Sequence, residues 1–526
     1  MWFNFIKPRP DKSLRPHVRK LVGKWLSPAC RNKSLVEENT FFFLNQKGSL
    51  ADDGWDNPER DKLWRYNQHY FDDLNAEKAH ERIKWHNILL KKWINENTPG
   101  AGSGWEPYPT SLRIVNWIKW HCVGNLLNDE CLHSLAVQAR WLYRRIEWHL
   151  LGNHLFANAK ALVFAGVFFK GKEAESWLSM GLNIIKNELP EQVLQDGGNF
   201  ELSPMYHSIF LEDLMDLNNL SRAYTNSLPK NQTVLWEKTT KAMLNFLEGI
   251  CHPDGEIPMF NDSAFGISPH PLKLFKYAKR LGIHNTNLVF KESNLSLKQY
   301  VQSGYICLES PFAFCILDVA RVGPDYLPAH AHSDTLSFEL SLFGKRFIVN
   351  GGTSTYKRSY IRQFERSTSA HNTVEIDGKN SSEVWSEFRV ARRAYPINLK
   401  IEEDNKLIQV LCSHNGYHNF LDRTTHERKW IFTKDKLLIK DKILGKFKKA
   451  IARFYFHPNI QVIDKRIGTY LLEVEGKTIV IKIIVGEGKI EPGFYAPEFG
   501  IREKTNCLAV DFGNDYSSVV EISWGI

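Results

Sequence analysis

Two histidines and an aspartate alternate in the segment YLPAHAHSDTLSFEL, where His330, His332 and Asp334 precede a run of alternating apolar and polar residues. An extended backbone turns alternate side chains to the same side, so this spacing predicts that the three point the same way. Such a cluster is typical of a metal site or an acid–base site, although a lone histidine is usually structural. Asn350 in FIVNGGTSTY and His371 in STSAHNTVEIDG lie at the ends of further predicted strands. We expect the three strand ends to converge on one cation.

A second group of polar residues lies in the first half of the chain. Asn153 and His154 stand at a predicted helix start in GNHLFANAKAL, and Glu201, Tyr206 and His207 surround another in DGGNFELSPMYHSIF. Taken singly, such an asparagine can be a helix cap and such a tyrosine a core residue. Taken together, the asparagine and histidine can neutralise a carboxylate, and a phenol beside a histidine can donate or accept a proton.

The elements that position these residues are of two kinds. Before about residue 300 the apolar residues recur at intervals of three and four, which predicts helices over 111–127, 133–151, 153–169 and 209–224. After about residue 303 the period becomes two, as in TLSFELSLF at 335–343, which predicts antiparallel strands. The sequence therefore predicts an all-α domain followed by an antiparallel β-sandwich.

Length and composition set the class of protein. A chain of 526 residues exceeds what one core usually organises, so we expect two large domains. Its 43% hydrophobic and 24% charged residues exclude a mostly disordered or fibrous chain. The longest apolar stretch, 161–169, is about half of what a membrane-spanning helix needs, so we expect no such span. Eight cysteines without CxxC pairs predict reduced thiols rather than disulfides or zinc knuckles.

The net charge of +9 favours a polyanionic partner, and the 13% aromatic content suits either sugar stacking or core packing. Seven basic residues lie between positions 7 and 24, behind an aromatic tip at 2–6, and no signal peptide is seen. We expect a cytoplasmic protein whose N-terminus is either a solvated tail or a peripheral contact with the inner membrane. No recognition motif supports nucleic acid as a partner.

Six segments, in this order along the chain, resemble the heparinase II/III-like polysaccharide lyases. They are WRYNQHYFDD (64–73), WEPYPTSLRIVNWIKW (105–120), GNHLFANAKALVFAG (152–166), DGGNFELSPMYH (196–207), HAHSDTLSFEL (330–340) and RSTSAHNTVEIDG (366–378). The resemblance implies an N-terminal (α/α) toroid, which is an incomplete helical barrel, followed by a C-terminal antiparallel β-sandwich. We expect a basic extension at 1–50, the toroid at 51–300 and the sandwich at 301–526.

The resemblance also implies roles for four residues. Asn153 and His154 match the pair that neutralises the uronate carboxylate, Tyr206 the tyrosine that protonates the leaving oxygen and is a candidate to remove H5, and His330 the histidine that acts as base or positions the sugar. The implied reaction is β-elimination of a uronate-containing glycan, which leaves a 4,5-unsaturated uronate. A C5-uronyl epimerase of similar fold and a non-catalytic glycan-binding protein are the alternatives. The expected substrate is an acidic polysaccharide or a lipid-linked glycan of surface-polysaccharide metabolism, such as capsule or lipopolysaccharide biosynthesis.

The resemblance assigns a structural divalent cation, zinc or calcium, to His332, His371 and the position of Asn350. The family's ligand at this last position is an aspartate, and an amide oxygen is a poorer zinc ligand than a carboxylate. We therefore expect zinc to be favoured but weakly held, replaced or absent, with Asp334 as a compensating ligand only if its strand bends.

Further residues are candidates to line a sugar groove. The tryptophans would stack on sugar rings and Arg113 would pair with an acidic group, whereas core packing is the alternative for all of them. The candidates are Asn67, His69, Trp105, Arg113, Trp117, Glu201 and His207. Arg362 and Arg366 precede His371 and are expected either to contact an anionic sugar or to be solvated.

Overall fold

The computed structural model describes residues 9–283, 295–418 and 423–525, so the aromatic tip of the predicted membrane contact, at 2–6, lies outside the described residues. By its contacts the chain divides into two compact units. The first unit comprises Met1–Val193, Ile209–Ala242 and Leu272–Thr286, and the second comprises Leu194–Ser208, Met243–Pro271 and Asn287–Ile526. Each unit is made of three separate stretches of the chain, so the domain boundaries expected at residues 50 and 300 stay a prediction.

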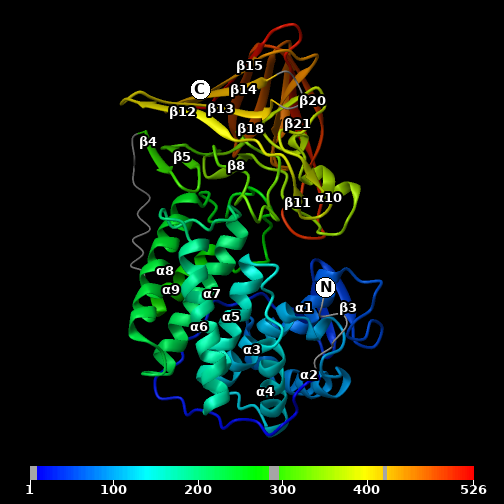
Figure 1. Cartoon of the computed structure of the whole chain (residues 1–526). Coiled ribbons are helices and arrows are strands. Elements are labelled where there is room, and N and C mark those ends of the chain that lie inside the picture. The colour runs from blue at the N-terminus through cyan, green and yellow to red at the C-terminus, as the bar shows by residue number, and fades with distance from the viewer. Residues whose placement is uncertain (1–8, 284–294, 419–422, 526) are drawn as a thin grey trace. The chain divides into compact units, whose positions relative to one another are not determined.

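The first unit is built of helices, which Figure 1 shows in blue to green. They are α1 (Lys62–Tyr70), α2 (Ile83–Glu96), α3 (Pro107–Cys122), α4 (Asp129–Tyr143), α5 (Gly152–Phe168), α6 (Lys172–Gln192), most of α7 (Pro204–Ala223), part of α8 (Lys230–Ile250) and α9 (Pro271–Arg280). Side chains cap the N-termini of some of these helices. At the start of α4, for example, the Asn128 side chain accepts a hydrogen bond from the Cys131 N–H. Helix α5 is apolar and buried along almost its whole length, as expected of a helix surrounded by others.

The predicted helix over 133–151 is wrong at its end, because α4 stops at Tyr143. The Glu147 N–H bonds the Asn158 side-chain oxygen at 2.9 Å instead of a helical carbonyl, so a side-chain contact turns the chain here. The expected basic extension also contains a small antiparallel sheet, whose strands are β1 (Leu35–Glu37), β2 (Thr40–Phe43) and β3 (Gln46–Ser49).

Two buried lysines tie three helices of the first unit together. Lys119 of α3 and Lys160 of α5 donate to the same Asp216 carboxylate of α7, at 2.9 and 2.7 Å. All three side chains are buried, and burial without these partners would be costly for each charge. The network therefore fixes the helices against one another.

The second unit is built of antiparallel sheets, drawn as arrows in Figure 1. One has the order β4-β5-β6-β7-β8, with bounds Ser296–Tyr300, Tyr305–Ser310, Ala313–Asp318, Phe338–Leu342 and Lys345–Ile348. The largest has the order β12-β13-β14-β15-β22-β19-β18-β17, with bounds Pro396–Glu403, Leu407–Tyr417, Thr424–Thr433, Lys436–Leu444, Ser517–Ser523, Lys477–Val485, Thr469–Val474 and Gln461–Arg466. A third has the order β20-β21-β16-β9, with bounds Glu487–Tyr495, Glu503–Asp511, Ala450–Tyr455 and Val374–Ile376.

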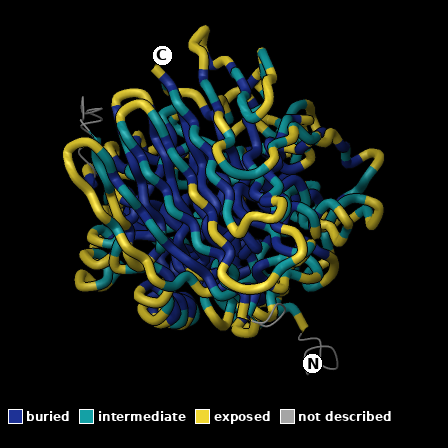
Figure 2. Tube along the Cα trace, turned by 90° about the horizontal axis from the view of Figure 1, so that it is seen from above, coloured by how far each residue is buried: buried dark blue, intermediate teal, exposed yellow. Residues whose placement is uncertain are grey.

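The burial pattern explains how these sheets pack. Strand β14 alternates strictly between buried and partly exposed residues, so one face packs inward and the other meets solvent. In β7 both faces are buried, because Glu339 on the polar face lies 3.3 Å from Arg346 and 2.9 Å from His252. One apolar core joins strands of all three sheets, and Figure 2 shows the dark buried interior beneath exposed turns.

The predicted order of helices followed by antiparallel strands is confirmed. Within the described residues, no helix combines the length and the apolar character needed to cross a bilayer.

Candidate functional site

The acid–base candidates of the second unit gather where α7 begins. The Ser203 hydroxyl accepts from the Tyr206 N–H at 3.2 Å, which caps the helix and places Tyr206 in its first turn. Leu202, just before the cap, has φ +58°, and Asn261, just before Asp262, has φ +56°. The Asn261 side chain donates to the Leu202 carbonyl at 2.8 Å. Left-handed conformations at non-glycine residues persist only where contacts enforce them, and here they bring two distant loops together.

Asp262 is the centre of this cluster. Its fully buried carboxylate faces His330 Nδ1 at 3.0 Å and His332 Nε2 at 2.8 Å. The Arg362 guanidinium donates to both of its oxygens, with Nη2 at 2.7 Å. Burial raises the pKa of Asp262, but the Arg362 charge and the hydrogen bonds from the two histidines outweigh burial and hold it well below its usual range. Asp262 is therefore ionised and orients two imidazoles and a guanidinium.

His330 lies between two carboxylates. Its Nδ1 faces Asp262, and its Nε2 lies 3.4 Å from Glu201 Oε2. Its ring stacks on the ring of Tyr206, with centroids 3.9 Å apart and planes at 28°. Contacts on both edges and one face fix this ring.

A tyrosine that sequence reasoning missed, Tyr356, completes the cluster. Its hydroxyl lies 3.2 Å from the hydroxyl of Tyr206. Burial and the nearby Asp262 charge raise the pKa of Tyr356 well above its usual value, so it stays a phenol and can donate to Tyr206. The Phe388 ring covers both Tyr356, at 5.1 Å, and His330, at 5.9 Å. The Tyr206 side chain is thus held between a histidine ring and a hydroxyl donor.

The predicted extended segment around the histidines is wrong in detail. Residues 330–337 alternate between turns and irregular backbone, Leu336 has φ +65°, and β7 begins only at Phe338. His330 and His332 nevertheless reach the same carboxylate. Asp334 is buried, and its Oδ2 has no hydrogen-bond partner among the described residues, so it does not share this contact.

In the first unit, Asn153 and His154 stand in the first turn of α5, directly after Leu151 with φ +56° and ψ −158°. His154 Nδ1 lies 3.2 Å from Glu147 Oε2, and its ring lies 4.4 Å from that of Tyr108. The side chain of His154 stays 31% exposed. Glu147 also accepts from Asn158 at 3.2 Å, so it is a fixed carboxylate that orients His154.

Several predicted groove residues belong to the core instead. Arg113 lies over the Trp93 ring at 3.9 Å and donates to Gln138 at 3.0 Å. His207 Nε2 bonds the Met243 carbonyl at 3.1 Å. The structure corrects the groove assignment for the candidates whose side chains are buried in helical packing, where they cannot stack on a sugar: His69, Trp105, Arg113, Trp117 and His207. Glu201 is buried against His330, and Asn67 is partly exposed and donates to the Leu63 carbonyl.

The predicted metal residues lie close to one another. The rings of His332 and His371 are 5.2 Å apart, and His371 Nδ1 faces the Asn350 oxygen at 3.2 Å. His332 Nδ1 and His371 Nε2 have no hydrogen-bond partner among the described residues. Burial lowers the pKa of His332 to about 4 and that of His371 well below its usual value, so both rings are neutral.

This donor set does not fit a structural zinc site. Such sites are closed by thiolate, imidazole and carboxylate ligands, whereas two imidazoles and an amide leave the set short of a charged ligand. Among the described residues, no group of three or more His, Cys, Asp or Glu side chains is placed to hold a metal ion. The divalent cation therefore stays a prediction from the resemblance.

We expect Asn350→Asp to make the stability of the chain depend on zinc more strongly than the stability of the wild type does. Without zinc the new carboxylate is a buried charge without a cationic partner, so the variant should melt at a lower temperature than the wild type. With zinc the carboxylate completes the ligand set, and the melting temperature should rise above the metal-free value. Thermal unfolding with added zinc and with EDTA measures both. A variant whose melting temperature is the same with zinc and with EDTA would contradict this account.

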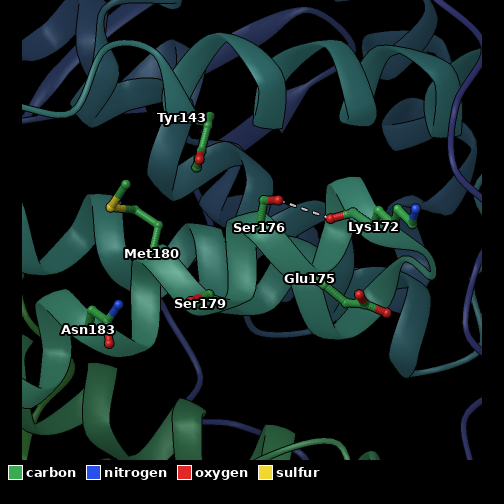
Figure 3. A pocket seen from close by; sticks show the side chains of 7 residues that line it. All are labelled: Tyr143, Lys172, Glu175, Ser176, Ser179, Met180 and Asn183. Carbon is green, nitrogen blue, oxygen red and sulfur yellow. Dashed lines mark hydrogen bonds between the residues drawn. The ribbon is translucent and has the colours of Figure 1, made fainter.

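A surface cavity of about 380 Å³ lies apart from these groups in the first unit. Figure 3 shows that most of its lining comes from one face of α6, with Tyr143 opposite. The Ser176 hydroxyl there donates to the Lys172 carbonyl of its own helix at 3.0 Å. Its lining contains no histidine and only one tyrosine, so we assign the acid–base chemistry to the Asp262 cluster instead.

The comparisons with known proteins agree with the fold. Residues 60–281 match the family model described as heparinase II/III N-terminus, and residues 292–524 match heparinase II/III-like, C-terminal. A heparin-sulfate lyase of Bacteroides stercoris is 25% identical over 391 residues, 70% of this chain and 56% of that protein. One of Pedobacter heparinus is 26% identical over 336 residues, 60% of this chain and 47% of that protein. This chain thus spans about half the length of the curated relatives it matches.

The crystal structure of heparinase III superposes with TM-score 0.73 at 19% identity, over 91% of this chain and 80% of that one.

Proposed function

Because the chain belongs to the heparinase II/III-like family, we propose that it is a polysaccharide lyase that cleaves a uronate-containing glycan by β-elimination. The observation that carries this proposal is Tyr206, stacked on His330 and within 3.2 Å of the Tyr356 hydroxyl. Such a phenol is suited to move a proton, which is the chemistry that elimination needs.

The reaction balances within the substrate. The C5–H bond breaks, its electron pair forms the C4=C5 double bond, and the C4–O bond breaks so that the leaving oxygen takes a proton. No water is consumed, and one proton moves from C5 to the leaving oxygen. A single group that first accepts and then returns this proton is sufficient.

We assign that group to Tyr206. As a phenolate it accepts H5, and as a phenol it protonates the leaving oxygen. The Tyr356 hydroxyl, which keeps its proton, donates to the phenolate oxygen and stabilises it. His330 has a carboxylate at each ring nitrogen, at 3.0 and 3.4 Å, so it serves better to position Tyr206 and the sugar than to remove H5.

The carboxylate of the uronate must be neutralised before H5 becomes acidic enough to leave. We propose Asn153 and His154 for this task, in line with the resemblance. His154→Ala should lower kcat/KM for the uronate polymer by about 10²-fold, because charge stabilisation in the transition state is lost. Initial rates with His133→Ala as the control variant test this, since His133 lies partly exposed on α4. Equal rates for His154→Ala and wild type would refute the assignment.

The proposed substrate is an acidic polysaccharide, since the curated relatives are named heparin-sulfate lyases. A lipid-linked glycan and a membrane-contacting N-terminus rest on the sequence pattern alone. Two residues of the basic segment are engaged with the helical unit: Arg15 pairs with Asp129 at 2.6 Å, and Arg19 donates to the Val167 carbonyl at 2.9 Å. Flotation with vesicles of anionic lipid tests the membrane proposal.

The test of the proposed function is a panel of uronate polymers. Heparan sulfate, heparin, chondroitin sulfate and hyaluronan are incubated with the chain, and absorbance near ~230 nm reports the conjugated unsaturated uronate. We expect a rise with at least one polymer. A flat trace on all of them, from a chain that binds one of them, would overturn the lyase proposal.

A further inference from the structure

A two-stranded hairpin in the second unit is anchored to the Asp262 cluster by two buried arginines. The hairpin consists of β10 (Val384–Trp385) and β11 (Arg389–Val390). Arg362, which pairs with Asp262, also donates from Nε and Nη2 to the Glu387 carbonyl at 3.1 and 2.8 Å. Arg366 donates to the Ser386 and Arg389 carbonyls at 3.1 and 3.2 Å.

The same Arg366 donates to the Ala331 carbonyl at 3.0 Å, directly beside His330 in the chain. Both guanidinium groups are fully buried, which corrects the expectation that they either contact an anionic sugar or are solvated. Guanidinium groups in such multiple bonds hold their partners in a defined geometry. The hairpin is therefore a rigid extension of the candidate site.

The rigid hairpin presents an indole to solvent. Trp385 is 52% exposed, and Arg389, which is also exposed, is its directly paired partner across the two strands. Paired residues of an antiparallel ladder stand on the same face, so both side chains leave the hairpin on one side. Phe388, at the turn, is 37% exposed and contacts the His330 and Tyr356 rings.

This combination has a recognisable chemistry. An aromatic ring offers an apolar face to the C–H groups of a pyranose, and a guanidinium pairs with a carboxylate or sulfate. The ring is held on a rigid backbone, so stacking on it costs little additional conformational entropy. A sugar of an acidic glycan carries both complementary features.

We propose that Trp385 and Arg389 form a glycan subsite for the sugar next to the one that reacts, with Trp385 stacking on the ring and Arg389 pairing with its acidic group. This inference rests on the proposed function for the identity of the polymer. Phe388 links the subsite to His330 and Tyr356. The residues that touch this sugar are specificity determinants and take no part in the proton transfer.

The experiment measures binding separately from turnover. Heparan sulfate oligosaccharides are titrated by calorimetry into the Tyr206→Phe chain, with and without Trp385→Ala. We expect Trp385→Ala to raise Kd about tenfold, the loss of roughly 1.4 kcal/mol. Trp385→Phe should restore most of the affinity, and Arg389→Gln should weaken binding mainly at low salt.

The matched control is Tyr516→Ala. Tyr516 is 58% exposed, lies just before β22, and its ring contacts Phe447 at 5.4 Å. Its removal should leave Kd unchanged. Melting temperatures of all variants establish that they fold, which the exposure of both aromatic residues leads us to expect.

Each outcome is decisive. An unchanged Kd in Trp385→Ala, an equal loss in Tyr516→Ala, or no oligosaccharide binding to the parent chain overturns the subsite. Binding that depends on Trp385, together with a wild-type chain that produces no unsaturated uronate from any polymer of the panel, supports the subsite and overturns the lyase proposal instead.

Discussion

Tyr206→Phe should reduce kcat for the uronate polymer by at least about 10³-fold, because the variant removes the hydroxyl that both accepts and donates the transferred proton. The rest of the ring remains, so its stacking on His330 at 3.9 Å is kept. The Kd for the polymer should therefore change by no more than a factor of about two. Stopped-time assays near ~230 nm and calorimetric binding measure the two quantities.

The control for this variant is Tyr360→Phe, which also loses only a hydroxyl. Tyr360 is 83% exposed at the start of α10 (Tyr360–Glu365) and should be replaceable without effect on kcat. Wild-type turnover in Tyr206→Phe would show that another group moves the proton.

Asp262→Asn should be the most destabilising single substitution in the site, by about 3–5 kcal/mol in the free energy of unfolding. The substitution leaves the buried Arg362 guanidinium without its charged partner. It also removes the acceptor that orients His330 and His332, so kcat should fall in whatever fraction stays folded. Denaturant unfolding of both chains measures the difference in stability.

The matched control is an exposed ion pair of the same unit. Lys345 lies 3.3 Å from Glu475, and the two side chains are 59% and 57% exposed. Lys345→Gln should change the free energy of unfolding by no more than about 1 kcal/mol. If Asp262→Asn is as mild as this control, the Arg362–Asp262 pair does not hold the site together.

Periodicity predicted the fold well, because helices and strands impose different spacings on apolar residues. The intervals of three and four in 153–169 correspond to α5, and the alternation after residue 303 corresponds to the sheets. Helix ends were less predictable, since the turn after Tyr143 depends on a bond between Glu147 and Asn158 that local spacing does not reveal.

The candidate site was predictable only where its residues are neighbours in sequence. His330 and His332 were found from their spacing, and Tyr206 from its position at a helix start. Tyr356 was missed, because it lies 150 residues from Tyr206 in the chain and meets it only through the fold. Its segment, FIVNGGTSTY, drew attention only for Asn350.

The prediction that buried residues of the helical domain line a sugar groove was wrong for a related reason. The sequence shows that a helix contains a tryptophan, but it does not show whether that side chain faces the core or a groove. Trp105 and Trp117 both contact Trp93 in the helical core, at 5.6 and 5.9 Å, and Arg113 lies over the same indole. The exposed Trp385 carried no sequence signal, because its two-residue strand is too short to show a period.

Mass spectrometry of the reaction products tests the central claim most directly. A lyase adds no water, so we predict two product chains whose masses sum to that of the substrate, one of them with an unsaturated uronate. Repeating the reaction in deuterium oxide distinguishes the epimerase alternative. Product masses that sum to the substrate plus one water, or deuterium at C5 of a polymer that is never cleaved, would contradict β-elimination.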